Sequence, residues 1–188
     1  GKMGYALAEE CASRGAEVIL VSGPVTLKEH HPNIRRIDVE SAEEMYEEAR
    51  RAYTDADAGI LCAAVADFTP DHTADHKIKR GKDGMTIQLK PTKDIAASLG
   101  ATKKEGQVLV GFALETNDEQ QNAKGKLERK NFDFIVLNSL NDKGAGFRVD
   151  TNKISIIDRQ DTTSYPLKNK SEVAKDIIDR LVQTLNKN

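Results

Sequence analysis

Residues 61–80 combine side-chain types that suit a phosphate-bearing ligand. A run of small and apolar residues predicts a buried strand over 59–66, and the carboxylate of Asp67 follows it. Ten residues after Asp67, a charged loop reaches Lys77 and Arg80. Ligands of α/β proteins bind outside the carboxyl ends of parallel strands, so we expect Asp67 and this loop to face a ligand. The alternative is that Asp67 only caps the strand end and that the cationic residues are solvated.

Three further groups of residues fall at predicted strand ends or just after them. Phe112, next to Gly111, ends an apolar strand and could shelter a base or a ribose, or be ordinary core. Lys126 and Lys130 are four apart on a predicted helix, so they share either an anion or a solvated face. Residues 93–95 open a helix whose free N–H groups could meet a ligand, although a simple helix start explains them equally well. All three groups point to the same edge of a sheet.

Several chemistries have no visible apparatus in the chain. It contains no Gly-x-Gly-x-x-Gly after a strand, no Gly-x-x-x-x-Gly-Lys-Ser/Thr, no Gly-x-Ser-x-Gly and no Tyr-x-x-x-Lys. The four histidines, His30, His31, His72 and His76, show no zinc-type spacing. The sequence therefore gives no support to hydride transfer or nucleophilic hydrolysis, and it predicts no metal ligand.

Length and composition predict one globular domain over residues 1–188. Charged residues make up 31% of the chain and hydrophobic residues 38%, and the formal net charge is −2. This balance argues against binding of nucleic acid or of a membrane surface. Cys11 and Cys62 lie in apolar patterns and are expected to be buried free thiols in a reducing compartment. No membrane-spanning run or signal peptide is visible, so we expect a cytoplasmic protein.

Alternating strands and helices predict an α/β fold with a doubly wound, mostly parallel, Rossmann-like sheet. A C-terminal antiparallel hairpin is expected around residues 159–161. The expected strands are 17–22, 34–39, 59–66, 85–90, 108–113, 134–138, 153–158 and 162–167. The expected helices are 5–14 ended by Gly15, one after the capping box 41–44 reaching Tyr53, 94–99 ended by Gly100, one capped by Asn117 or Asp118, and 171–185.

The first predicted helix has no strand before it in this chain. In a doubly wound fold the first strand, its glycine turn and the start of the next helix together form a phosphate site. We therefore expect the chain to be a fragment, a processed product or the ordered part of something longer, with the N-terminal strand missing.

Taken together, these segments resemble the phosphopantothenoylcysteine synthetase family, and specifically its bacterial type. There the domain usually forms the C-terminal half of a bifunctional coenzyme A biosynthesis protein. The segments that carry the resemblance are 1–4 (Gly-Lys-Met-Gly), 21–24 (Val-Ser-Gly-Pro), 63–67 (Ala-Ala-Val-Ala-Asp), 77–79 (Lys-Ile-Lys), 93–95 (Lys-Asp-Ile), 111–116 (Gly-Phe-Ala-Leu-Glu-Thr) and Asn138. They occur in family order and spacing over essentially the whole chain.

The resemblance implies a phosphopantothenate–cysteine ligase that uses CTP with a divalent cation, usually Mg²⁺. The carboxylate of 4′-phosphopantothenate attacks the α-phosphate, and the amine of L-cysteine then displaces the nucleotide. Lys77, on a flexible loop, would close over the active site as the catalytic cation. The implied nucleotide contacts are Ala63, Ala64, Asp67, Lys77, Lys93, Asp94, Ile95, Ala96, Phe112, Lys126 and Lys130, and the implied substrate contacts are Lys77 and Asn138.

Two departures from the family pattern bear on activity. Upstream of residues 1–4 the family carries a strand, a glycine-rich turn and an asparagine assigned to acyl-nucleotide binding, and this chain has none of them. We expect weak or absent activity from these residues alone. Thr92 stands in a segment where many relatives have Asn-Pro-Asp, and we expect it to change a loop rather than the chemistry.

The resemblance also implies a homodimer and a possible fusion to a flavin-dependent decarboxylase. Two other functions stay open from the residues alone. One is a nucleotide-cofactor oxidoreductase on a similar sheet, which would need a glycine fingerprint. The other is a nucleotide-binding or assembly module without catalytic activity.

Overall fold

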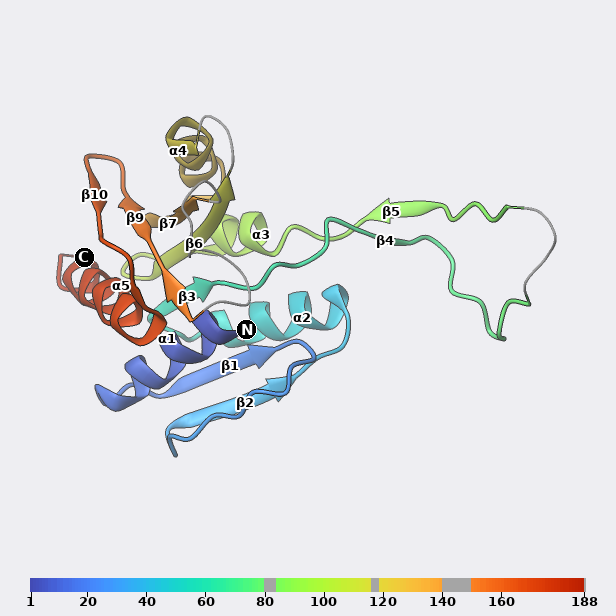
Figure 1. The fold of residues 1–188 in the computed structure, drawn as a ribbon, viewed down its shortest axis with the longest axis horizontal. Coiled ribbons are helices and arrows are strands. Elements are labelled where there is room, and N and C mark those ends of the chain that lie inside the picture. The colour runs from blue at the N-terminus through green and yellow to red at the C-terminus, as the bar shows by residue number, and fades with distance from the viewer. Residues whose placement is uncertain (80–83, 116–118, 140–149, 188) are drawn as a thin grey trace.

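A five-stranded sheet forms the centre of the computed structural model, which describes residues 1–79, 84–115, 119–139 and 150–187 (Figure 1). Its strands, in spatial order, are β10 (Thr162–Ser164), β9 (Ile154–Ile157), β7 (Phe134–Ser139), β6 (Val108–Glu115) and β3 (Ala58–Leu61). β3, β6 and β7 run parallel, while β9 and β10 add the antiparallel hairpin. The prediction of a mostly parallel sheet with a C-terminal hairpin is confirmed.

A second parallel pair lies beside this sheet. β1 (Val18–Ser22) pairs along its length with β2 (Ile34–Asp38), and α1 (Lys2–Ser13) packs on the pair. Gly15, with φ of +92°, follows α1 in the left-handed region, as expected of a helix stop. In the part of the chain that the structure describes, β1 and β3 are both edge strands, so each has one unpaired side.

Helices cover both faces of the central sheet, as a doubly wound fold requires. α1 and α5 (Lys170–Leu185) pack on one face, against the buried side chains of Val110 and Val136. α3 (Ile95–Thr102) and α4 (Glu119–Arg129) pack on the other, together with the end of α2 (Ala42–Tyr53). The capping box of α2 is present, while Asn117 and Asp118 lie outside the described residues. Two short strands that the sequence did not predict, β8 (Thr151–Asn152) and β11 (Lys168–Asn169), pair before α5. No helix among the described residues is long and apolar enough to cross a bilayer.

The predicted strand 59–66 is wrong in its second half. The ladder between β3 and β6 ends at Leu61, opposite Gly111, and residues 62–66 form no strand. Ala63, Ala64 and Ala66 are exposed rather than buried. Alanine has little strand preference, and these methyl groups have no bulk to pack between helices, so the chain leaves the sheet here.

A long two-stranded arm replaces the predicted strand 85–90. β4 (Phe68–Pro70) pairs antiparallel with β5 (Leu89–Pro91), and Asp71 lies 3.6 Å from the ammonium of Lys90. Figure 1 shows this arm reaching far out from the two sheets. Its described residues 72–79 and 84–91 are all exposed. Apolar residues do alternate over 85–90, but no described part of the chain covers them.

Gly100 does not end a helix, contrary to the prediction. α3 continues through it to Thr102, and Gly100 lies against the end of α4. A Cβ atom at this position would lie 2.0 Å from the carbonyl oxygen of Lys130. The glycine is needed because two backbones approach closely, and a sequence pattern cannot show that.

The two cysteines are free thiols, and each is partly buried. Burial raises the pKa of Cys11 and of Cys62 to about 11. This lies two units above the ordinary 9.0, so we expect alkylation by iodoacetamide at pH 8 to be about 100-fold slower than in the unfolded chain. Mass spectrometry of both thiols with and without urea measures the ratio. Equal rates in the two states would contradict the burial of these side chains.

Candidate active site

The base of the arm brings Asp67 next to the segment that opens α3. The N–H of Thr92 donates to the carbonyl oxygen of Asp67 at 2.9 Å, and its hydroxyl donates to that of Ala66 at 2.7 Å. The Asp67 side chain is exposed at the carboxyl side of β3. Thr92 therefore ties the outgoing and returning chains together. Sequence reasoning treated it as a neutral loop change and missed this role.

Asp94 and Lys130 form the best-defined charged pair at this edge. The Lys130 ammonium lies 3.1 Å from the Asp94 carboxylate, which also accepts the N–H of Ala97 at 2.9 Å as the cap of α3. Burial alone would raise the pKa of Asp94. The Ala97 N–H and Lys130 outweigh it, so the pKa lies below its ordinary value. Ile95 and Ala96 pack partly into the core beneath this pair.

The Lys93 side chain points elsewhere, toward α2. Its ammonium lies 2.5 Å from Glu43 and 3.5 Å from Glu47, and 4.6 Å from the centre of the Tyr46 ring. A hydrogen bond with Glu43 is the main cause that raises the pKa of Lys93. Any ligand contact at this position would involve its backbone or require this cluster to open.

Lys126 and Lys130 have different surroundings despite their shared helix face. Lys126 lines a shallow hollow of about 360 Å³ along α4, together with Gln121, Gly125 and Arg129. Lys130 instead has Asp94 as its counter-ion. The two lysines therefore need no shared anion to be stable neighbours.

Phe112 and Asn138 lie near the carboxyl ends of β6 and β7, on the face that α1 and α5 cover. Phe112 is partly buried against the core cluster of that face. The amide oxygen of Asn138 is buried and has no hydrogen-bond partner in the described structure. An unpaired buried acceptor costs about 1–3 kcal/mol, so this oxygen is well placed to accept a ligand hydrogen bond.

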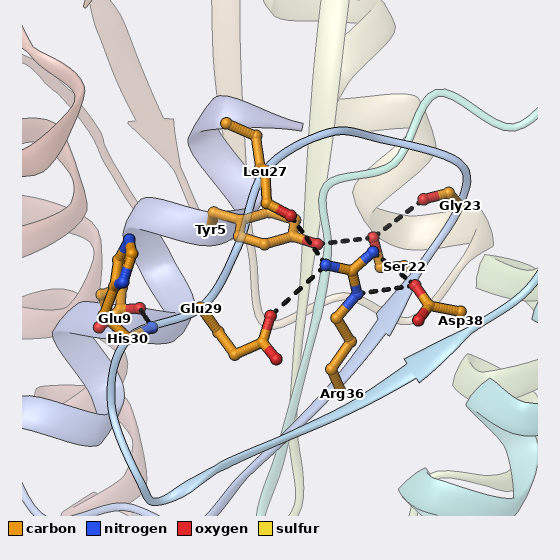
Figure 2. Close-up of polar contacts among 9 residues, drawn as sticks. All are labelled: Tyr5, Glu9, Ser22, Gly23, Leu27, Glu29, His30, Arg36 and Asp38. Atoms are coloured by element: carbon orange, nitrogen blue, oxygen red, sulfur yellow. Dashed lines mark hydrogen bonds and ion pairs between the residues drawn. The ribbon is translucent and has the colours of Figure 1, made fainter.

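A polar network that the sequence did not predict fixes the start of α1 against the ends of β1 and β2 (Figure 2). The hydroxyl groups of Tyr5 and Ser22 share a hydrogen bond of 3.0 Å. Arg36 lies over the Tyr5 ring, donates to Asp38 at 2.7 Å and donates to the Leu27 carbonyl at 2.8 Å. The network therefore holds the loop after β1 beside α1. In the sequence, the only signal for this network was segment 21–24, which contains Ser22 and is one of the segments that carry the family resemblance.

Positive charge gathers where α1 begins. Lys2 lies 2.6 Å from Asp150, and the largely buried Lys170 starts α5 nearby. Burial lowers the pKa of Lys170, Lys2 lowers it further, and Asp150 opposes both effects. Lys2, Lys170 and the free N–H groups of a helix start bring positive charge to this point, which favours an anion there.

Lys77 is not brought to any of these groups. It lies in the exposed outer part of the arm, between β4 and β5. The structure thus joins Asp67 with residues 92–94 and Asp94 with Lys130, and it leaves Lys77 apart. Within the described residues, no three His, Cys, Asp or Glu side chains are grouped to hold a metal ion.

Comparisons with known proteins match essentially the whole chain to one family. The family model described as DNA/pantothenate metabolism flavoprotein C-terminal domain matches residues 1–185. A cysteine/cysteine sulfinic acid decarboxylase from an unknown prokaryotic organism is 57% identical over 97% of this chain and 51% of that protein. The coenzyme A biosynthesis bifunctional protein CoaBC of Bacillus subtilis is 46% identical over 96% of this chain and 45% of that protein. The chain spans about half the length of the curated relatives it matches.

Solved structures give the same result for the fold. The crystal structure of the C-terminal domain of CoaBC superposes with a TM-score of 0.84 at 36% identity, covering all of this chain and 84% of that one. A Cab2 mutant in complex with phosphopantothenate-cysteine superposes with a TM-score of 0.74 at 16% identity, covering all of this chain and 78% of that one. The second likeness shows a shared fold alone.

Proposed function

Because this chain belongs to the family of the DNA/pantothenate metabolism flavoprotein C-terminal domain, the phosphopantothenoylcysteine synthetase family, we propose that it is the ligase part of a coenzyme A biosynthesis enzyme. The reaction joins 4′-phosphopantothenate to L-cysteine at the expense of CTP. The observation that carries the proposal is the match along the entire chain to the C-terminal domain of the bifunctional CoaBC proteins. One relative is named as a decarboxylase. This chain covers 51% of that protein, so we do not transfer the name to this domain.

The proposed chemistry has two steps. A carboxylate oxygen of 4′-phosphopantothenate attacks the α-phosphorus of CTP, and pyrophosphate leaves. The amine of cysteine then attacks the acyl carbon, the bond to CMP breaks, and the amine proton is lost to water. Negative charge grows on phosphate oxygens in the first step, and fixed cations lower its cost.

The sheet edge offers separate places for the two phosphate-bearing substrates. The start of α1, with Lys2 and Lys170 close by, suits the phosphate of 4′-phosphopantothenate. Asp67 and the Asp94–Lys130 pair lie where we place CTP. Asn138 offers its unpaired amide oxygen to a substrate N–H group near the ends of β6 and β7.

Magnesium fits this arrangement as an ion that arrives with the triphosphate. Mg²⁺ is commonly held by one or two carboxylates together with substrate phosphates, and the exposed Asp67 supplies one carboxylate. When bound, it would neutralise phosphate charge. Asp67 would hold the ion–nucleotide pair, and Lys130 would balance the charge beside it.

We further propose that a strand preceding Gly1 in the full-length protein lies between β1 and β3. Both strands have an open edge on the described part of the chain, and both belong to parallel pairs with helices on their faces. A strand there would lead directly into α1 and would join the two sheets into one. The same upstream region would also carry the glycine-rich turn and the asparagine expected from the family.

Replacing Asp67 with asparagine should weaken nucleotide binding, because the exposed carboxylate is lost while the backbone hydrogen bond to Thr92 remains. We expect Kd for Mg·CTP to rise about tenfold, the effect of roughly 1.4 kcal/mol. Isothermal titration with CTP and with ATP measures this and also tests the choice of base. Asp71→Asn is the matched control, since Asp71 lies out on the arm with Lys90. An unchanged Kd in Asp67→Asn would remove Asp67 from the site.

Assembly and location complete the proposal. We propose a homodimer in the cytoplasm, with a flavin-dependent decarboxylase half upstream, as in a bifunctional CoaBC arrangement. Formation of the amide product by the full-length protein would distinguish a ligase from a binding module without activity. Tight binding of NADPH without product would favour the oxidoreductase alternative.

A further inference from the structure

The loop after β1, residues 23–29, packs directly on the first turn of α1. Gly1 is the N-cap of that helix, and a Cβ atom there would lie 3.2 Å from Cγ1 of Val25 and 3.3 Å from Cδ1 of Leu27. Two side chains of the loop therefore rest on the helix start itself. Because we place the phosphate of 4′-phosphopantothenate at this helix start, the loop forms one wall of that place.

This loop has little backbone support of its own. Among the described residues, none from 24 to 29 makes a hydrogen bond between backbone groups. Side chains hold its two ends instead. The Ser22 hydroxyl donates to the carbonyl oxygen of Gly23 at 3.0 Å, and the Glu9 carboxylate accepts the N–H of His30 at 2.6 Å. The position of the middle of the loop then depends on one further side chain.

Arg36, on β2, holds the middle of the loop (Figure 2). Its guanidinium donates to the carbonyl oxygen of Leu27 at 2.8 Å and lies 3.5 Å from the Glu29 carboxylate. The same group lies 5.7 Å from the centre of the Tyr5 ring on α1. Two further nitrogens engage the Asp38 carboxylate at 2.7 Å and 2.6 Å. One guanidinium thus connects β2, α1 and the loop.

The contacts of Arg36 leave it poorly suited to bind an anion itself. The carboxylates of Glu29 and Asp38 already offset its charge, and a carbonyl oxygen takes one of its N–H groups. Only 18% of its side chain is exposed. An effect of Arg36 on an anion would therefore come through the position of the loop, which makes it a positioning residue rather than a phosphate ligand.

We propose that Arg36 sets the affinity for the phosphate end of 4′-phosphopantothenate by holding loop 23–29 against the start of α1. This inference rests on the proposed ligase function and assigns a positioning residue to its acid substrate. A loop that is fixed before the substrate binds has less entropy to lose on binding. Val25 and Leu27 also displace water beside the first N–H groups of α1, and this strengthens their attraction for a phosphate.

The substitution Arg36→Gln in the full-length protein tests the proposal. We expect KM for 4′-phosphopantothenate to rise about tenfold, the typical effect of losing one charge-assisted hydrogen bond. KM for CTP and kcat at saturation should stay within about twofold, because the loop walls the place of only one substrate. An unchanged KM for 4′-phosphopantothenate would overturn the proposal. An equal rise in both KM values would also overturn it, since that would indicate a general loss of structure.

Arg35→Gln is the matched control, because it removes the same charge from the next residue of β2. Successive side chains of a strand point to opposite faces, and Arg35 is exposed. All kinetic constants of this variant should equal those of the wild type. A rise in KM for 4′-phosphopantothenate as large as that of Arg36→Gln would mean that net charge, and not the position of the loop, is responsible.

Leu27→Ala tests whether Arg36 acts through the loop. It removes a side chain that rests on α1 and keeps the backbone carbonyl that Arg36 binds, so it should raise the same KM. Combined with Arg36→Gln, it should add little, because both changes act on one loop. Effects that multiply would overturn the proposal.

Urea titration shows whether each variant is folded. If Arg36→Gln is not, Arg36→Lys replaces it, since lysine keeps the charge but lacks the fork that joins Asp38 to the Leu27 carbonyl. The same separation of the two KM values is expected of it, and wild-type values would overturn the proposal. Absence of amide product from the wild-type full-length protein would instead count against the proposed function itself.

Discussion

Replacing Lys77 with glutamine is expected to lower turnover by about 10²–10³, the typical loss for one oriented charge donor at a developing negative charge. The residue is exposed on the arm, so the substitution should leave the folded chain intact. Its ammonium would act mainly while charge builds on the phosphate oxygens. We therefore expect kcat to fall far more than the affinity for CTP.

Rapid-quench and steady-state assays of the full-length protein check this expectation. Lys90→Gln is the matched control, because it removes the same charge from the same arm and loses only an exposed contact with Asp71. It should stay close to the wild type. Unchanged turnover in Lys77→Gln would show that the arm does not deliver a catalytic cation.

Replacing Gly100 with alanine should lower the free energy of unfolding by about 3 kcal/mol, at the upper end for overpacking. The added Cβ would lie 2.0 Å from the Lys130 carbonyl oxygen and 2.8 Å from its carbon. These are backbone atoms, so no side chain can move aside and α3 must shift against α4. Because Asp94 caps α3 and pairs with Lys130, the shift should also weaken CTP binding.

Gly125→Ala is the control for this effect, since it makes the same change within α4. Its Cβ would come no closer than 3.6 Å to Arg129, an ordinary contact. Alanine at this helical position should raise the free energy of unfolding by up to about 1 kcal/mol. Urea titrations compare both variants with the wild type. Equal stability of Gly100→Ala and the wild type would refute the close approach of the two helices.

Local signals in the sequence predicted much of the fold correctly. The capping box at Ser41 and Glu44 and the left-handed Gly15 depend on neighbours a few residues away, and both are present. The predictions for Gly100 and for the strand over 59–66 were wrong because both depend on residues that are distant in the sequence. Their outcome depends on the Lys130 carbonyl and on where the ladder with β6 ends, which no local pattern shows.

In the candidate site, too, local patterns predicted some features, and tertiary packing decided the others. The strand-end rule predicted that Asp67 and residues 93–95 lie at one edge of the sheet, and hydrogen bonds from Thr92 join the two segments there. It could not predict that Glu43 and Glu47 of α2 would engage Lys93, or that Arg36 would join Tyr5 to the loop after β1. These contacts depend on how helices pack. The alternation in residues 85–90 was recognised as a strand, but the surface that would cover it is not in the described chain.

One isotope experiment tests the central claim, that the chain joins an acid to an amine through an acyl-nucleotide. The full-length protein is supplied with Mg·CTP, L-cysteine and 4′-phosphopantothenate labelled with ¹⁸O in its carboxylate. If the carboxylate attacks the α-phosphorus, mass spectrometry should find one ¹⁸O atom in CMP, unlabelled pyrophosphate and one ¹⁸O atom in the amide product. Label in orthophosphate together with CDP, or no amide product at all, would contradict the account.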